Sequence, residues 1–174
     1  VLLVVLIIAF SILKPDTFPT AFNFRSIVSN KSIQALVALA VFIPMAANHF
    51  DLSSGFMLGI SQVLAIGLQS QYGQGLPWMI ACLLVLLLGA AVGLINGLLV
   101  TRVRMDSFIA TLGTGTMLYG LNAWYTGGQQ VLGTLPASFL SISATVKVAD
   151  FGVPAPALYV LVVSIGLWIV FEYL

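Results

Sequence analysis

The residues that could take part in chemistry gather in one short polar stretch, Asn48 to Gly55, which separates two apolar segments. It holds an ionisable carboxylate, Asp51, among hydroxyl, imidazole and amide side chains. Pro44 lies just upstream and has no N–H to donate, so we expect the helical backbone to open there. Broken helices beside polar residues are where membrane transporters expose backbone groups to a solute or an ion. The stretch therefore predicts positions in a translocation pathway or hinge, namely Asn48, His49, Asp51, Ser53, Ser54 and Gly55.

Helix capping is a second interpretation of the same stretch. The side-chain oxygen of Asp51 or Ser53 would accept hydrogen bonds from amides one turn into the next helix, and the helix dipole would favour the carboxylate there. Capping needs only local geometry, and one residue can both cap a helix and line a pathway. His49 predicts no metal site, because zinc or copper would need further histidine, cysteine or carboxylate ligands at suitable spacing. We expect no metal and no cofactor.

Three more polar side chains lie within apolar segments and are further pathway or hinge candidates: Asn96, Thr111 and Thr114. An amide in hydrocarbon needs a hydrogen-bond partner on another helix, so Asn96 is expected first to join helices and only second to contact a solute. Threonine hydroxyls can bond to their own helix or to a neighbouring one.

Glycines recur at four-residue spacing in the longest apolar segment, at Gly89, Gly93 and Gly97. One face of that helix then lacks side chains, which lets another helix approach closely. Ordinary packing in a helical bundle explains such a face, and a close contact beside a moving pathway is the alternative. We predict helix packing at these three positions.

The sequence offers no catalytic or nucleotide-binding motif. Gly113 and Gly115 begin a GxGxxG pattern, but Leu118 occupies its last position and no strand is expected before it. A phosphate-binding loop of the Walker type is also absent from the sequence. The few polar residues form no credible Ser-His-Asp or Cys-His arrangement. We therefore predict a protein that is not an enzyme and has no catalytic residue.

The elements that must position these residues are predicted to be membrane helices. Hydrophobic residues make up 60% of the 174-residue chain, charged residues make up 6%, and the mean hydropathy is +1.13. A soluble domain has about 25% charged residues, so lipid is the expected surrounding of this chain. A bilayer offers no water to unpaired amides, and long unbroken apolar runs favour helices over the alternating strands of a barrel.

Six apolar segments follow one another, at about residues 1–13, 32–47, 54–68, 77–100, 108–125 and 156–174. A spanning helix needs roughly 20 residues, so only the fourth and the last are comfortably long, and the second and third are short. We predict an all-α, polytopic transmembrane bundle of about six segments, two of them short or broken. The apolar residues at both ends lead us to expect that 1–174 is one membrane domain from a longer chain, truncated at both ends.

Charge predicts the orientation of the chain rather than a charged partner. The net charge of +1 and the scattered basic residues give no reason to expect nucleic acid as a partner. The positive-inside rule places the short loop with Arg102 and Arg104 in the cytoplasm, and the loop from Thr126 to Pro154 outside. Three basic residues before the second segment conflict with this rule unless they belong to a tilted interfacial helix. They are Lys14, Arg25 and Lys31.

Three stretches resemble motifs of ribose-type sugar permeases in bacterial ABC importers. Phe50–Gly55 resembles their DLSVG motif, Gly93–Val100 their GxxNGxLV motif and Ser107–Thr114 their FIxTLGT motif. The three occur in the expected order, and the resemblance runs from about Ala35 to Gly133. The set is specific, although each stretch alone would be weak evidence. Ser54 departs from the family pattern, because it stands where valine is usual.

Members of that family are inner-membrane subunits that pair with a second permease copy, bind cytoplasmic ATPase subunits and receive sugar from a periplasmic binding protein. The resemblance implies a multi-pass permease of the bacterial inner membrane that moves a monosaccharide by alternating access, while ATP is hydrolysed on another polypeptide. Related permeases for nucleosides or branched-chain amino acids share the general architecture, so those solutes stay open. An ion-coupled transporter using Asp51, or a membrane scaffold that transports nothing, are the other hypotheses.

Overall fold

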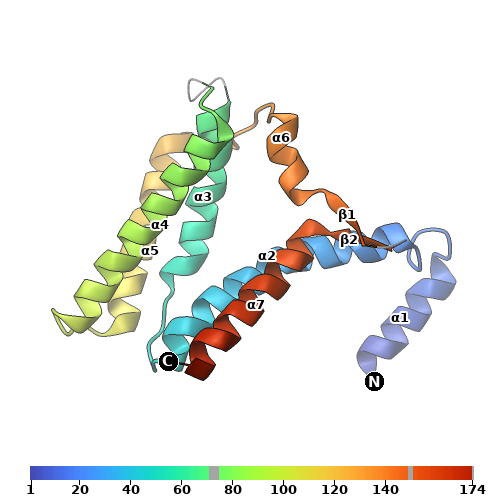
Figure 1. The fold of residues 1–174 in the computed structure, drawn as a ribbon, viewed down its shortest axis with the longest axis horizontal. Coiled ribbons are helices and arrows are strands. Elements are labelled where there is room, and N and C mark those ends of the chain that lie inside the picture. Colours follow the sequence, from blue (N-terminus) through green and yellow to red (C-terminus); the bar gives the residue numbers. More distant parts are fainter. Residues whose placement is uncertain (71–74, 149–150, 174) are drawn as a thin grey trace. The chain divides into compact units, whose positions relative to one another are not determined.

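The computed structural model describes residues 1–70, 75–148 and 151–173, and their regular secondary structure is helical apart from one short hairpin (Figure 1). The helices are α1 (Leu2–Leu13), α2 (Ala21–Ala46), α3 (Ser53–Gln69), α4 (Trp78–Thr101), α5 (Ser107–Thr126), α6 (Ala137–Leu140) and α7 (Ala155–Tyr173), with a 3₁₀ turn, η2 (Ser141–Ser143), after α6. The strands are β1 (Thr145–Val148) and β2 (Phe151–Pro154). The prediction of a polytopic helical fold is confirmed.

Three helices are long and apolar enough to cross a membrane, judged by the length and composition of the described residues. They are α2 with 26 residues, α4 with 24 and α7 with 19. α1 and α3 are shorter apolar helices, and α5 has 20 residues. Each of the six predicted segments coincides with a helix. The number of crossings stays a prediction, because length and hydropathy alone do not decide which of the shorter helices span.

The prediction that the second segment is short is wrong, because α2 begins at Ala21 rather than near residue 32. Residues 21–43 include polar side chains but no glycine or proline, so the hydropathy falls where the helix does not break. The hydroxyl oxygen of Thr20 accepts the amide of Asn23 at 3.2 Å and caps the first turn. The basic residues Arg25 and Lys31 therefore lie on α2 itself and not on a separate interfacial helix.

The short hairpin is the exception to the all-α prediction. β1 pairs antiparallel with β2, so that Thr145 lies opposite Pro154 and Val146 opposite Val153. The sequence predicts only an outer loop here, and residues 149–150 of that loop lie outside the described residues. The β-branched and aromatic residues of the two strands favour extended backbone, which explains why they pair.

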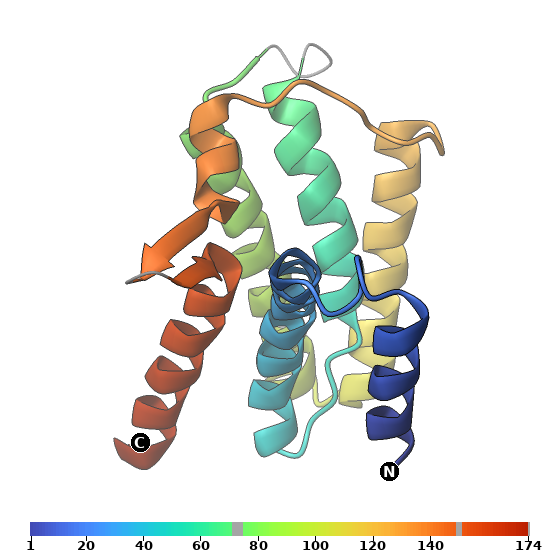
Figure 2. The ribbon, with the colours of Figure 1, turned by 90° about the vertical axis from the view of Figure 1, so that its right-hand side faces the viewer.

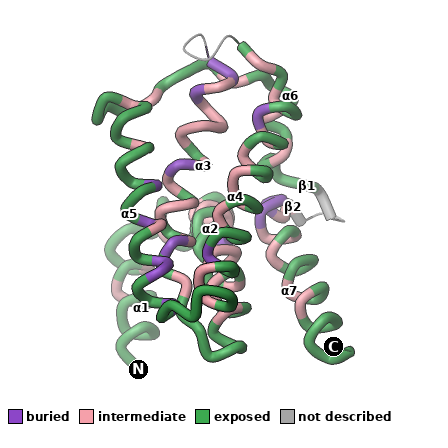
Figure 3. The backbone as a smooth tube through the Cα atoms, turned by 90° about the vertical axis from the view of Figure 1, so that its left-hand side faces the viewer, coloured by how far each residue is buried: buried purple, intermediate pink, exposed green. Residues whose placement is uncertain are grey.

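The chain groups into two compact units, Val1–Leu36 with Ile142–Leu174, and Val37–Ser141. In the unit Val37–Ser141, α3, α4 and α5 pack against one another (Figure 2). Its buried positions are few and gather on α3 and α5, with two more on α4 (Figure 3). Large apolar side chains such as Leu86 and Met117 point outward instead, as expected of a surface that faces lipid. A single membrane domain stays a prediction.

The other unit contains α1, the first part of α2, the hairpin and α7. The amide of Ala155 donates to the carbonyl of Ala144 at 3.1 Å, so α7 begins directly beside the start of the hairpin. The hydroxyl of Tyr159, one turn further on, donates to the carbonyl of Ile142 at 2.7 Å. These two bonds fix the start of α7 to the segment that precedes the hairpin.

Candidate functional site

The polar stretch begins where α2 ends, and Asn48 shapes that end. Pro44 lies inside α2, yet the helix continues to Ala46 and opens only after it, slightly later than predicted. Asn48 has a positive φ of 61°, a backbone conformation that asparagine tolerates better than most residues. Its amide donates to Met45 O at 2.9 Å, and the amide of His49 donates to Pro44 O at 2.9 Å. This is the Schellman arrangement that ends a helix and turns the chain.

The carboxylate of Asp51 organises the start of α3. Its Oδ1 accepts the amide of Ser53 at 2.8 Å and the hydroxyl of Ser53 at 2.6 Å. Its Oδ2 accepts the hydroxyl of Ser54 at 3.0 Å. Asp51 therefore bonds to the first amide of α3, whereas the N-cap position is Leu52 and has no side-chain cap. The prediction that Asp51 or Ser53 caps α3 by accepting amides one turn into the helix is wrong, because the Asp51 carboxylate lies one residue before the cap position and its oxygens are taken by Ser53 and Ser54.

Ser53 also links the Asp51 carboxylate, through hydrogen bonds, to α4 and α5. Asn96 Nδ2, on α4, donates to Ser53 Oγ at 2.9 Å, and the hydroxyl of Thr114, on α5, donates to Asn96 Oδ1 at 2.8 Å. Ser53 and Asn96 are only 3% and 7% exposed. A continuous chain of hydrogen bonds, Asp51–Ser53–Asn96–Thr114, therefore joins α3, α4 and α5. The prediction that Asn96 needs interhelical partners is confirmed.

Two side chains near the start of α5 hold the connection between α2 and α3. Phe50 N donates to Ser107 Oγ at 3.1 Å, and Leu52 N donates to Thr111 Oγ1 at 3.1 Å. The Thr111 hydroxyl lies 2.7 Å from Ser107 O and 3.2 Å from Phe50 O, either of which can take its proton. The opened backbone is thus satisfied by hydroxyls of a neighbouring helix, which is how irregular backbone is tolerated within a membrane protein.

Most of the predicted pathway or hinge residues therefore join the helices or shape the connection between α2 and α3, and the side chains of two do neither. Asn48, Asp51, Ser53, Ser54, Asn96, Thr111 and Thr114 shape the connection or join the helices. His49 is exposed, and only its backbone amide takes part in ending α2. Gly55 has no atom within 4 Å of the place where a side chain would begin, apart from its own helix and neighbours, so nothing described requires glycine there. Their role in transport stays a prediction.

Two polar residues at the start of α5, one in the site and one beside it, were missed by the sequence analysis. Ser107 is 8% exposed and accepts the Phe50 amide. Asp106 caps α5, since its Oδ1 accepts the amides of Phe108 at 2.9 Å and Ile109 at 3.3 Å. A signal for Asp106 was present, because an aspartate directly before an apolar helix is a common cap. No local signal identifies the partner of Ser107, which is 57 residues away in sequence.

The glycines of α4 pack less closely than predicted within this chain. A side chain begun at Gly89 would meet Met57 Cε at 3.6 Å, but nothing described lies within 4 Å of one begun at Gly93 or Gly97. Close approaches occur at other glycines: Phe56 lies against Gly115, and the hydroxyl of Tyr125 lies against Gly67. The reason is that α3 and α5 supply the tight contact, and each brings an aromatic ring to a glycine of the other. Helix packing at Gly93 and Gly97 stays a prediction.

The site is a set of side-chain hydrogen bonds that connects helices. Its carboxylate, Asp51, already accepts three hydrogen bonds from two serines. No group of three or more His, Cys, Asp and Glu side chains that could hold a metal ion occurs among the described residues. The arrangement can therefore set the relative positions of three helix ends and the connection between α2 and α3.

Comparisons with known proteins identify the family. Residues 23–173 match the family described as branched-chain amino acid transport system / permease component. The chain is 29% identical to the galactose/methyl galactoside import permease protein MglC of Haemophilus influenzae, over 92% of this chain and 52% of that protein. It is 33% identical to MglC of Escherichia coli, over 72% of this chain and 39% of that protein.

A third relative is the autoinducer 2 import system permease protein LsrC of Yersinia enterocolitica, 36% identical over 71% of this chain and 33% of that protein. The chain thus spans about half or less of the length of the curated relatives that it matches. No solved structure matches it. The resemblance to import permeases, drawn from three short stretches of sequence, is confirmed, and the chain belongs to the family of branched-chain amino acid transport system permease components.

Proposed function

We propose that this chain is part of the membrane-spanning permease subunit of a bacterial ABC importer that moves a monosaccharide inward. The observation that carries the proposal is the match to the permease family together with relatives named as galactose and autoinducer 2 import permeases. The subunit itself is a transport component and not an enzyme. The energy comes from ATP hydrolysed by a separate subunit. The hydrogen-bonded network described above connects the helices that move during transport.

The location of the network supports that role. Arg102 directly follows α4, and the positive-inside rule places the loop between α4 and α5 in the cytoplasm. Ser107 and Thr111, at the start of α5, hold Phe50 and Leu52. The connection between α2 and α3 therefore belongs to the cytoplasmic end of these helices, where an ATPase would act.

The proposed mechanism is alternating access. ATP binding and hydrolysis on the partner bias two arrangements of the helices, and a connection held by side-chain hydrogen bonds can shift between them without unwinding a helix. In this mechanism Asp51, Ser53, Asn96 and Thr114 transmit a movement of the cytoplasmic end from α3 to α4 and α5. The residues act through helix position and not through bonds to the solute.

The partners follow from the same proposal. They are cytoplasmic ABC ATPase subunits, a periplasmic sugar-binding protein that delivers the solute, a second permease copy and the lipid of the bacterial inner membrane. The many outward-facing apolar side chains support a lipid surrounding. No cofactor and no nucleic acid take part.

The test is uptake by the complete permease, reconstituted in liposomes with its ATPase and its binding protein. We expect accumulation of labelled galactose that requires ATP inside the liposomes and persists when an uncoupler dissipates ion gradients. Uptake that an uncoupler abolishes and that proceeds without the ATPase would instead identify an ion-coupled transporter. Absence of uptake for every solute tested would favour the hypothesis of a membrane scaffold that transports nothing.

A second candidate solute class has support of its own. The matched family is described by branched-chain amino acid transport, so leucine is the competing solute. Competition decides between them, because an excess of unlabelled leucine would suppress uptake of labelled galactose only if both use one pathway. Labelled leucine and uridine, tested in the same liposomes, cover the amino-acid and nucleoside alternatives.

A further inference from the structure

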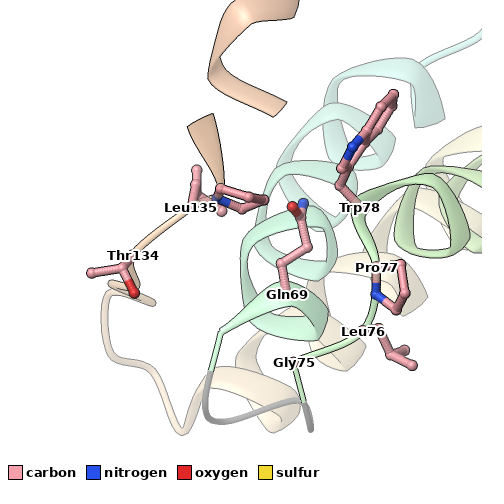
Figure 4. A pocket seen from close by; sticks show the side chains of 8 residues that line it. Gln69, Gly75, Leu76, Pro77, Trp78, Thr134 and Leu135 are labelled. Atoms are coloured by element: carbon pink, nitrogen blue, oxygen red, sulfur yellow. The ribbon is translucent and has the colours of Figure 1, made fainter. Parts of the chain in front are cut away.

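A pocket of about 460 Å³ lies at the end of the unit Val37–Ser141 where α3 ends and α4 begins. Its lining comes from the end of α3, the start of α4 and the extended segment before α6. Figure 4 shows the carboxamide of Gln69 between Leu135 and Trp78. A volume of this size falls within the range of small-molecule sites.

Gln69 gives the pocket an unmet hydrogen-bonding group. Its side chain is 8% exposed, and its Nε2 donates to Ala65 O at 2.6 Å. That bond fixes which end of the carboxamide is the oxygen. Oε1 is buried and has no hydrogen-bond partner among the described residues. A buried acceptor left unpaired is costly, so the pocket favours an occupant that donates an O–H or N–H at this point.

The remaining lining restricts the class of occupant. The described residues that line the pocket include no aspartate, glutamate, lysine, arginine or histidine, so none of them would compensate a buried charge. They do supply the indole ring of Trp78, whose face can cover the C–H face of a ring, and the hydroxyl of Thr134. A neutral solute with several hydroxyls fits these features, whereas a zwitterionic amino acid does not.

The pocket also lies at the end of the unit where a delivered solute would arrive. Trp78 is the first residue of α4 and Arg102 follows its last, so the pocket and the two-arginine loop are separated by the whole 24-residue helix. That length is about 36 Å, enough to cross the hydrocarbon core. If the arginine loop is cytoplasmic, the pocket opens at the outer end.

We propose that this pocket is an entry site for a monosaccharide at the outer end of the permease, where Gln69 Oε1 accepts a sugar hydroxyl and Trp78 packs against the sugar ring. The proposal rests on the function proposed above and adds a place where the solute is held before it moves inward. Neither the match to the family nor the network around Asp51 requires such a site.

Direct binding tests the proposal on the complete permease, assembled with its ATPase in lipid nanodiscs; galactose binding is measured without the binding protein, and affinity for the binding protein is measured separately. Equilibrium binding of labelled D-galactose is measured for the wild type and for Gln69→Leu, which removes the acceptor at similar size. We expect about fivefold weaker binding, the effect of losing one neutral hydrogen bond. Gln62→Leu, at an exposed glutamine of the same helix, is the matched control and should leave binding unchanged.

A second pair of variants keeps the test valid if Gln69→Leu folds poorly. Trp78→Ala should weaken galactose binding, while Trp124→Ala, at an exposed tryptophan on α5, should not. Unchanged galactose binding in folded Gln69→Leu and Trp78→Ala would overturn the entry site, and so would leucine binding as tight as galactose binding. Variants that lose affinity only for the binding protein would also overturn it, because the pocket would then dock a protein side chain.

Failure of the entry site and failure of the proposed function give different results. Galactose uptake by the wild type, together with unchanged galactose binding in the pocket variants, removes the entry site alone. Neither uptake nor binding of any monosaccharide by the wild type removes both.

Discussion

Asn96 Nδ2 donates a 2.9 Å hydrogen bond to Ser53 Oγ, although the two residues are 43 positions apart and lie on different helices. Ser53 Oγ in turn donates to Asp51, and the Asn96 oxygen accepts from Thr114. In this series of hydrogen bonds, each side chain both donates and accepts, except the two at its ends. Replacing the carboxamide in the middle should therefore disturb three helices at once.

Asn96→Leu should lower the free energy of unfolding by about 1–2 kcal/mol, because the buried Ser53 loses a donor and Thr114 loses its acceptor on α4 and keeps only carbonyls of its own helix. Unfolding of the complete permease in mixed micelles with increasing SDS measures the change. Thr116→Val is the control, since Thr116 is exposed and its hydroxyl bonds only to carbonyls of its own helix. Equal losses in both variants would show that the interhelical bonds contribute nothing of their own.

Asp51→Ala should lower solute uptake more than it lowers the amount of folded permease in the membrane. The carboxylate holds Ser53 and Ser54, so its loss should shift the balance between helix arrangements as well as fray α3. We expect uptake per folded permease to fall about tenfold, which corresponds to roughly 1.4 kcal/mol.

Asp106→Ala is the matched control for Asp51, because Asp106 also accepts amides at the start of a helix but takes no part in the network. It should reduce folded permease while leaving uptake per folded molecule near the wild-type level. Should Asp51→Ala reduce uptake and folded amount in equal proportion, stabilising the start of α3 would be the only role of Asp51.

Asn48→Val should destabilise the permease by about 1–2 kcal/mol, because a β-branched residue is strained at a φ of 61°. Asn48→Gly should be neutral or slightly stabilising, since glycine adopts that conformation freely. Thermal unfolding of the two variants in detergent, followed by loss of soluble monodisperse protein, compares them. A stable Asn48→Val variant would mean that the turn after α2 rearranges.

Gly115→Ala should cost about 1–3 kcal/mol, because the added methyl group would lie 2.5 Å from the ring of Phe56 and must displace it. Gly113→Ala, two residues earlier on α5, meets nothing within 4 Å and should stabilise the helix by up to about 1 kcal/mol. The same SDS titration measures both. A neutral Gly115→Ala variant would contradict the close contact of α3 with α5.

The sequence predicted those properties that depend on each segment by itself. The scarcity of charge determined that lipid surrounds the chain, and unpaired amides in lipid then require helices. The apolar runs located six helices, and the need of a buried amide for a partner identified Asn96 as a residue that joins helices. The three family stretches pointed to the permease family to which the chain belongs.

The extent of α2 could not be predicted from hydropathy, because the polar residues of its first turns lower hydropathy without breaking the helix. The hairpin was missed for the opposite reason, since four-residue strands are too short for alternation to stand out. For α2, mean hydropathy was used although the absence of glycine and proline from residues 21–43 decides where the helix continues. For the hairpin, the pattern of alternation was used although the pairing of the two strands decides the structure.

Only the tertiary structure decided which residues meet. Sequence could say that Asn96, Thr111 and the glycines of α4 need neighbours, but the neighbours are tens of residues away and are chosen by how α3, α4 and α5 pack. That packing brings Ser53 to Asn96 and Ser107 to Phe50, and it brings aromatic rings to Gly67 and Gly115 rather than to Gly93 and Gly97. The physical reason is that a helix's own composition fixes which groups must be satisfied, whereas the partner depends on side-chain shapes on two helices at once.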